Sequence, residues 1–333
     1  MSTLIDLFTH IAPEGGVSGE AAIPSTPLPK GHDRHIGKDR QGRPLILVSV
    51  QRIAGEAIPI SYVLENLRVD HDLRCRIVDA TGRDRVASFS IIKCLSDDES
   101  LQGFFLRTMD ALLTALPDLP ALADVAEAVE SLISLFQEIR QPSSRPVAGL
   151  WGELLLIARS HHLRTALACW HNDVFETCDF SSGIERLEVK CAGDRTRRHH
   201  FSLEQCHVPA GSTQLVASLF VEPAAGGLSL GELWDSVREG VSDDPELSLK
   251  TDRVCVASLG SSWQEARLRR YDEQRAMDSL MLFDSSTIPR IEIPVQPGVS
   301  EVHFRSDLGM ASSVDIRDYL GGNALFDAIL RQR

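Results

Sequence analysis

The sequence lacks the features of three common classes of protein. No apolar run approaches the roughly 20 residues that cross a bilayer, and the first residues lack the basic and apolar regions of a signal peptide. The seven cysteines include no CxxC pair, which is typical of reduced thiols. We therefore expect a cytoplasmic protein with no membrane-spanning segment.

Basic residues are also scarce, with 34 Lys and Arg against 47 Asp and Glu and a formal net charge of −13. This balance argues against a protein that coats duplex DNA by neutralising many phosphates. Any contact with nucleic acid should be local or shared with a partner. The 333 residues, 43% of them hydrophobic, are enough for a sizeable core and for more than one domain.

The apolar pattern predicts four segments: a β-rich module over 1–95, a helical connector over 96–145, an α/β core over 146–242 and a C-terminal extension over 243–333. The expected elements of the first module are a helix over 4–11, a loop to residue 29, and strands over 43–50, 73–78 and 86–94, with a hairpin turn at Thr81-Gly82. Those of the core are a helix over 147–169, strands over 173–182, 185–191 and 214–221, and a helix over 230–239. Those of the extension are a helix and then strands over 267–271, 277–283 and 301–304.

The stretch DFSSGIERLEVK, from Asp179 to Lys190, holds the most informative residues of the core. A two-residue type II′ turn at Gly183-Ile184 would place Asp179 opposite Glu188, with Cβ atoms roughly 5 Å apart. Alternation along the strand then puts Lys190 on the same face. Two carboxylates this close need a shared proton or a cation, and Mg²⁺ prefers such oxygen ligands. The pattern is typical of a metal-dependent phosphodiesterase, although a solvated hairpin would explain the same residues.

Three neighbouring features favour the phosphodiesterase interpretation. Glu153 lies beside the apolar stripe of the preceding helix and could reach the acid pair. Ser202 is a helix N-cap with Gln205 in the first turn, near the strand ends. A basic stretch suits a phosphate backbone, and we expect its DNA-contacting residues to be Arg195, Arg197, Arg198 and His200. Each feature also has a purely structural explanation. Glu153 could be solvated, Ser202 could be an ordinary helix cap, and the basic stretch could be a solvated loop.

Together these residues resemble the PD-(D/E)XK nuclease superfamily, and more narrowly the bacterial family of PD-(D/E)XK motif proteins. The resemblance lies in GLWGELLL at 149–156, in Asp179-Phe180 with LEVK at 187–190, and in RHHFSLEQ at 198–205. It implies an α/β (α+β) fold with a restriction-endonuclease-like αβββαβ core. Cys178 stands where the superfamily often has a proline, a position that tolerates other residues.

The resemblance also implies roles for individual residues. Glu153, Asp179 and Glu188 would ligate Mg²⁺ or Mn²⁺, with the carbonyl of Val189 as a further ligand. Lys190 would be the catalytic lysine, and Gln205 a supporting residue near the scissile phosphate. Members resemble components of phage-defence or restriction-modification operons with ATPase, helicase-like and methyltransferase genes. This implies DNA as substrate and protein partners for specificity, and leaves a homodimer open.

Two alternatives accompany the endonuclease hypothesis. The first is a catalytically inactive scaffold or DNA-binding subunit of a defence complex, which keeps the fold but not the chemistry. The presence of all the expected acidic and basic residues favours the active enzyme. The second is a zinc cluster, whose spacing fits no CxxC or HxxxH arrangement; its ligands would be Cys178, Cys191, His199, His200, Cys206 and His207.

Overall fold

The structure is a computed structural model, and it describes residues 3–11, 23–51, 57–78, 84–172, 176–292, 298–321 and 324–329. No helix within these ranges is both long enough and apolar enough to cross a membrane. The chain divides into two compact units. The first comprises residues 1–138 and 244–249, and the second comprises 139–243 and 250–333.

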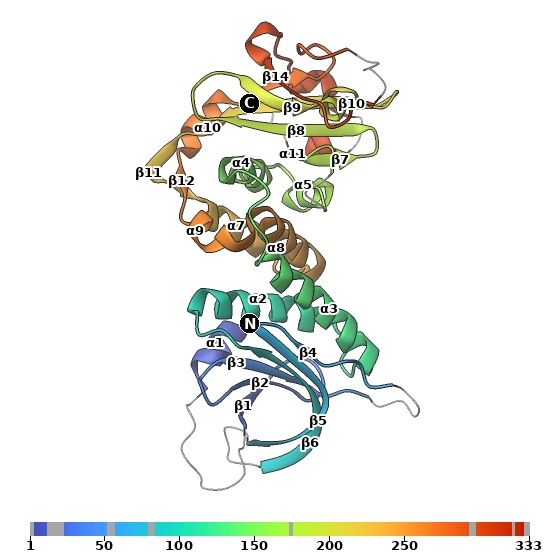
Figure 1. Ribbon diagram of the computed structural model, residues 1–333, viewed down its shortest axis with the longest axis vertical. Coiled ribbons are helices and arrows are strands. Elements are labelled where there is room, and N and C mark those ends of the chain that lie inside the picture. The colour runs from blue at the N-terminus through green and yellow to red at the C-terminus, as the bar shows by residue number, and fades with distance from the viewer. Residues whose placement is uncertain are drawn as a thin grey trace. The chain divides into compact units, whose positions relative to one another are not determined.

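The first unit is a curved β-sheet with helices (Figure 1). Its helices are α1 (Leu4–Thr9), α2 (Glu99–Ala115) and α3 (Leu122–Glu138). Its strands are β1 (Ile23–Pro27), β2 (Arg34–Lys38), β3 (Pro44–Val48), β4 (Tyr62–Val63), β5 (Leu67–Val78) and β6 (Asp84–Cys94).

The sheet of the first unit runs in the order β1-β2-β3-β6-β5-β4, and β1 also pairs with β5 in parallel. Five strands therefore close into a small barrel, which removes most unpaired strand edges. The barrel interior is filled by a buried apolar cluster of Leu45, Leu47, Ile77, Phe89 and Ile91. These residues alternate along their strands with residues of the opposite face, as a sheet with two covered faces requires.

The second unit contains the site residues that the sequence predicts. Its helices are α4 (Val147–Ala158), α5 (Leu163–Cys169), α6 (Leu203–Cys206), α7 (Leu230–Glu239), α9 (Trp263–Arg267), α10 (Glu273–Ser279) and α11 (Ala324–Ile329). Helix α8 (Pro245–Leu259) has residues in both units. Three 3₁₀ turns lie at Gly260–Ser262, Leu308–Met310 and Ile316–Tyr319.

The strands of the second unit form a four-stranded sheet and two short ribbons. They are β7 (Phe180–Ser182), β8 (Glu185–Ala192), β9 (Arg198–Ser202), β10 (Thr213–Phe220), β11 (Pro223–Ser229), β12 (Arg270–Tyr271), β13 (Met281–Asp284) and β14 (His303–Asp307). The sheet has the order β13-β10-β8-β7, with β8 and β10 parallel and the outer pairs antiparallel. The fold is mixed α and β, as the sequence predicts.

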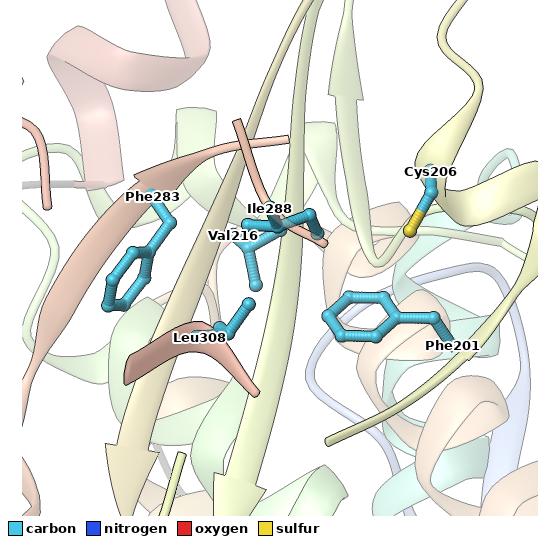
Figure 2. Packing of buried hydrophobic residues seen from close by; sticks show 6 residues of the cluster. All are labelled: Phe201, Cys206, Val216, Phe283, Ile288 and Leu308. Atoms are coloured by element: carbon cyan, nitrogen blue, oxygen red, sulfur yellow. The ribbon is translucent and has the colours of Figure 1, made fainter. Parts of the chain in front are cut away.

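Strand β9 leaves the sheet and pairs with β14 in an antiparallel ribbon. The ribbon is attached to the sheet by a buried cluster that Figure 2 shows: Phe201, Cys206, Val216, Phe283, Ile288 and Leu308. Phe201 comes from β9, whereas Val216 and Phe283 come from β10 and β13. Burial of these side chains, not strand pairing with β8, anchors the ribbon. It places Phe201 near Lys190 of β8.

Several predicted elements differ from those observed. The loop expected up to residue 29 contains β1, because its Ser and Pro residues pair with β2. The helix expected over 147–169 is two helices, since Ser160 bonds back to the carbonyl of Ile157 and ends α4.

Other differences concern strands. Of the strand expected over 173–182, residues 180–182 are extended and 176–179 are not, while 173–175 lie outside the described residues. The segment expected as a strand over 267–271 begins at the last residue of α9 and becomes strand at residue 270. The segment expected over 277–283 begins within α10, which Asp272 caps, and becomes strand at residue 281. The turn expected at Thr81-Gly82 lies outside the described residues.

Candidate active site

The β7–β8 hairpin has the predicted register. Ser182 pairs with Glu185 and Phe180 pairs with Leu187 across a two-residue turn. Gly183 has a φ of 55°, the left-handed backbone that the first central position of a type II′ turn requires. Asp179 lies directly before β7, and its Oδ2 accepts a hydrogen bond of 2.7 Å from the backbone N–H of Val189. The turn thus determines which atoms of β8 Asp179 can reach.

Helix α4 packs closely on β8 and brings Glu153 to the hairpin. A Cβ atom at Gly152 would lie 2.3 Å from Sγ of Cys191 and 3.6 Å from Cγ1 of Val189, so only glycine fits without rearrangement. Glu153 is the next residue and is 3% exposed. Its burial follows from a helix whose residues 150–157 are all buried. The close approach of α4 to β8 therefore determines where this carboxylate lies.

Three titratable side chains meet at one point inside the second unit. Within the described ranges, Glu153, His171 and Asp179 form a group whose potential ligand atoms all lie within 4.8 Å of one another. All three are buried. Nε1 of Trp170 donates to Oε2 of Glu153 at 2.8 Å, and Nε2 of His171 lies 3.2 Å from the same oxygen. The indole and imidazole hold the Glu153 carboxylate in one orientation.

Arg145 places a positive charge between the two carboxylates. Its Nη1 lies 3.2 Å from Oε1 of Glu153 and 3.2 Å from Oδ1 of Asp179. The same nitrogen is 3.4 Å from Nε2 of His171. The backbone N–H of Arg145 donates to the carbonyl of Ser258, which fixes the segment that carries it. The guanidinium group thus bridges the two acids as a cation.

The two acids titrate in opposite directions. Burial, and then the negative charges of Glu153 and Glu188, raise the pKa of Asp179 well above its usual value. Burial also acts to raise the pKa of Glu153, but the hydrogen bond from His171 and the charge of Arg145 outweigh it and lower that pKa. Asp179 therefore favours a proton or an additional positive charge, whereas Glu153 stays ionised.

A second group lies further along β8. Nζ of Lys190 is 2.8 Å from Oε1 of Glu188 and donates to Oε1 of Gln205 at 3.1 Å. Nε2 of Gln205 donates to Oε1 of Glu188 at 2.6 Å. Nζ of Lys190 also lies 4.7 Å from the centroid of the Phe201 ring. The three polar side chains and this ring form a closed network around the ammonium group.

The charge of Lys190 is retained in this network. Burial acts to lower the pKa of Lys190, but the charge of Glu188 and its hydrogen bond raise that pKa overall. Gln205 is held in place by its own helix, because its Oε1 accepts from the N–H of Ser202 and its N–H donates to the Ser202 hydroxyl. The N-cap at Ser202 is the one predicted from the sequence, and the reciprocal bond to Gln205 makes it a capping box. The ammonium group is therefore both charged and fixed in position.

The donor set fits a divalent cation. Oε2 of Glu188 is buried and has no hydrogen-bond partner among the described residues, although Lys190 pairs with the other oxygen of the same carboxylate. The negative charge of Glu188 raises the pKa of Asp179, so the two carboxyl groups interact. Arg145 already occupies the position of a cation between Asp179 and Glu153. Carboxylate oxygens around a positive charge are the ligands that Mg²⁺ and Mn²⁺ prefer.

The predicted site residues are thus distributed over two adjoining groups. Glu153 and Asp179 lie in the buried trio, and Glu188, Lys190 and Gln205 lie in the network beside it. Val189 contributes its N–H to Asp179. Two residues of the site, Arg145 and His171, were missed from the sequence. Arg145 lies in the Pro- and Ser-rich break at 141–146, which predicts a linker, and His171 has no ligand-like spacing to any other residue.

The predicted basic patch divides into residues of two kinds. Nη1 of Arg197 donates to the carbonyl and hydroxyl of Ser218 at 2.8 Å, and its guanidinium group stacks on Phe220 at 4.5 Å. Arg195 makes a bidentate pair with Glu222. Arg198 and His200 are exposed, as Arg195 is, but neither has a carboxylate partner among the described residues.

The cysteines and histidines weighed as zinc ligands do not gather in the part of the chain that the structure describes. Sγ of Cys191 instead packs against Gly152 of α4, and Nε2 of His199 lies 2.8 Å from the hydroxyl of Ser218. Burial raises the pKa values of the Cys178 and Cys206 thiols, to about 12 and about 11, so these thiols hold their protons.

Comparison with known proteins gives one family. The family model DUF4420, described as "Putative PD-(D/E)XK family member", matches residues 9–309 of the chain. The match includes α4, the β7–β8 hairpin and the capped turn that carries Gln205. A search of curated proteins and a search of solved structures each found no match.

Proposed function

Because the chain belongs to this PD-(D/E)XK family, we propose that it is a divalent-metal-dependent nuclease that hydrolyses phosphodiester bonds in DNA. The observation that carries the proposal is that the carboxylates of Glu153 and Asp179 converge on one positive charge, the guanidinium group of Arg145. The ion pair of Glu188 and Lys190 lies beside them. Such a site stabilises charge that develops on a scissile phosphate.

Glu153, Asp179 and Glu188 would hold Mg²⁺ or Mn²⁺ in this proposal. A bound ion would supply an activated water and neutralise charge on the phosphate. Arg145 would have to move away from at least one carboxylate, because its Nη1 lies 3.2 Å from both Glu153 and Asp179. Asp179 would release any proton it carries, since ligands bind metal in the deprotonated form.

The remaining residues would position the acidic side chains and neutralise negative charge on the phosphate. Lys190 keeps its charge within 2.8 Å of Glu188 and would stabilise negative charge on the phosphate or orient the attacking water. Gln205 fixes both Glu188 and Lys190 through its amide. His171 orients the carboxylate of Glu153 together with Trp170. The exposed Arg198 and His200 would contact the DNA backbone.

We further propose a role in a bacterial phage-defence or restriction-modification system, with specificity supplied by ATPase, helicase-like or methyltransferase partners. The net charge of −13 supports this, because a chain so acidic gains little long-range attraction to DNA by itself. The competing function is a scaffold or DNA-binding subunit without catalysis. The intact acid–lysine set favours the enzyme over that alternative.

A plasmid-nicking assay in Mg²⁺ or Mn²⁺ tests the proposal. It compares the wild type with Lys190→Ala, Asp179→Asn and the control Lys30→Ala, which removes an exposed lysine of the first unit. We expect the site variants to lose about a hundredfold or more in rate, the usual effect of removing a charge-stabilising group. Equal activity of all four proteins would end the catalytic interpretation. DNA binding without any metal-dependent nicking would identify the scaffold.

A further inference from the structure

The first unit carries a concentration of positive charge that the proposed nuclease site does not use. A cleft of about 340 Å³ opens at one end of the β-barrel, and its charged lining residues are Lys38, Asp39, Arg40, Arg43, Arg68 and Lys93. Five of these six are basic, in a chain whose net charge is −13. The β2–β3 hairpin supplies three of the cations, and the remaining two come from β5 and β6.

Two of the five cations are neutralised locally. Nε of Arg43 donates to Asp39 at 2.9 Å, and Arg68 makes a bidentate pair with Asp70 at 2.7 and 3.1 Å. Such pairs hold the guanidinium groups in fixed directions but leave little net charge. They build the wall of the cleft and do not supply its attraction for an anion.

The other three cations have no carboxylate partner among the described residues. Nζ of Lys38 lies 2.9 Å from the carbonyl of Ile11 and 4.7 Å from the centroid of the Phe8 ring, and neither partner is an anion. Arg40 is exposed and Lys93 is half-buried, and neither forms an ion pair with any residue in the described segments. Three uncompensated positive charges therefore line one cleft.

The strand register increases the electrostatic cost of this arrangement. Arg68 and Lys93 are direct cross-strand partners on β5 and β6, and Leu45 of β3 is the other neighbour of Lys93. Like charges directly opposite each other destabilise a sheet, and here Asp70 reduces the effect by pairing with Arg68. Lys93 has no carboxylate partner among the described residues, and an anion bound in the cleft would provide one.

We propose that this cleft binds the phosphate backbone of DNA. No aromatic side chain is among the described residues that line it, so these residues offer no surface on which a base could stack. Cations on flexible stems contact phosphates without reading sequence. A backbone site on the first unit gives an acidic chain local affinity for DNA, and the inference rests on the charges of the barrel alone and does not depend on catalysis.

The test is DNA binding in EDTA, measured by the fluorescence anisotropy of a short labelled duplex over a series of NaCl concentrations. The cleft variant is Arg40→Ala/Lys93→Ala, and the matched control is Lys30→Ala/Arg74→Ala. The control removes two exposed cations of the same unit that do not line the cleft, so both variants change the net charge equally. Thermal melting verifies that each variant is folded.

We expect the cleft variant to bind about tenfold more weakly at low salt and to reduce the slope of log K against log[salt] by about 2, one for each lost phosphate contact. The control should retain the wild-type slope. Wild-type affinity in the cleft variant, or equal losses in both variants, would overturn the proposal.

A second set of titrations measures the affinity of the wild type and both variants for tripolyphosphate and ATP. If the cleft variant loses affinity for these compounds while duplex binding is unchanged, the cleft is a small-polyphosphate site and the DNA proposal fails. Because no metal is present, these results are independent of nicking. If the protein never nicks DNA but the cleft variant shows the expected loss of binding, the nuclease function is contradicted and the cleft proposal stands.

Discussion

Arg145 and Asp179 form an ion pair, with Nη1 of the arginine 3.2 Å from Oδ1 of the aspartate. The same nitrogen contacts Glu153 at the same distance, so one guanidinium group pairs with both acids and leaves a net negative charge when both are ionised. This pairing occupies the place that the proposed function assigns to a metal ion. Arginine and metal should therefore compete for the same oxygens.

Competition between Arg145 and a metal ion predicts how the variant Arg145→Met should behave. Removing one partner of a buried ion pair destabilises a protein by about 3–5 kcal/mol, and here protonation of Asp179 reduces the loss. We expect a lower melting temperature without metal and a larger rise on adding Mn²⁺ than the wild type shows, because no guanidinium group has to be displaced. Differential scanning fluorimetry with and without Mn²⁺ measures both. Arg145→Lys, which keeps a charge, should lie between the two, and an equal Mn²⁺ response in all three would contradict competition.

The close packing of α4 on β8 makes a prediction for Gly152→Ala. The new methyl group would lie 2.3 Å from Sγ of Cys191, and overpacking of this kind costs about 1–3 kcal/mol. Gly149→Ala is the control in the same helix, because its Cβ would meet nothing within 4 Å and should stabilise by about 0.5–1 kcal/mol. Urea unfolding compares the two. In the double variant Gly152→Ala/Cys191→Ala most of the loss should be recovered, and failure of this rescue would locate the strain elsewhere.

The amide of Gln205 makes a prediction for Gln205→Leu. The change removes the 2.6 Å hydrogen bond to Glu188 and the 3.1 Å acceptor for Lys190. We expect a loss of stability of about 1–2 kcal/mol and a higher Mn²⁺ concentration for half-maximal nicking, because Glu188 is no longer fixed. Ser202→Ala removes the helix cap, costs about 1 kcal/mol, and keeps the Gln205 amide. If both variants need the same Mn²⁺ concentration as the wild type, Gln205 has a purely structural role.

The buried imidazole of His199 makes a prediction about pH. Burial, and then the charges of Lys190 and Arg197, lower the pKa of His199 to about 4. In the unfolded chain this pKa is about 6.5, so the neutral form stabilises the fold above pH 6.5, and that contribution is lost as the pH falls through 4.

Relative to His199→Gln, the free energy of unfolding of the wild type should fall by up to about 3 kcal/mol over this interval. Chemical denaturation at several pH values measures the difference. His303→Gln, which removes an exposed histidine of the same ribbon, gives the baseline. Curves for His199→Gln and the wild type that stay parallel down to pH 4 would exclude the coupling.

The sequence by itself determined the local parts of this protein. The Gly183-Ile184 turn follows from glycine's access to positive φ, and the cap at Ser202 follows from hydroxyl and amide groups three residues apart. The apolar stripe of α4 predicted a helix that faces the sheet with Glu153 on its flank. These features depend on neighbours along the chain, where spacing is sufficient information.

The tertiary structure decided which distant residues meet. Arg145 and His171 join the acids because the break at 141–146 is bonded to the carbonyl of Ser258 and α5 packs near β7, and neither contact has a sequence spacing. The β9–β14 ribbon and the basic cleft of the barrel likewise combine strands far apart in the chain. Long-range packing and strand pairing set these positions, and their free energy comes from burial and hydrogen bonds that no local pattern encodes.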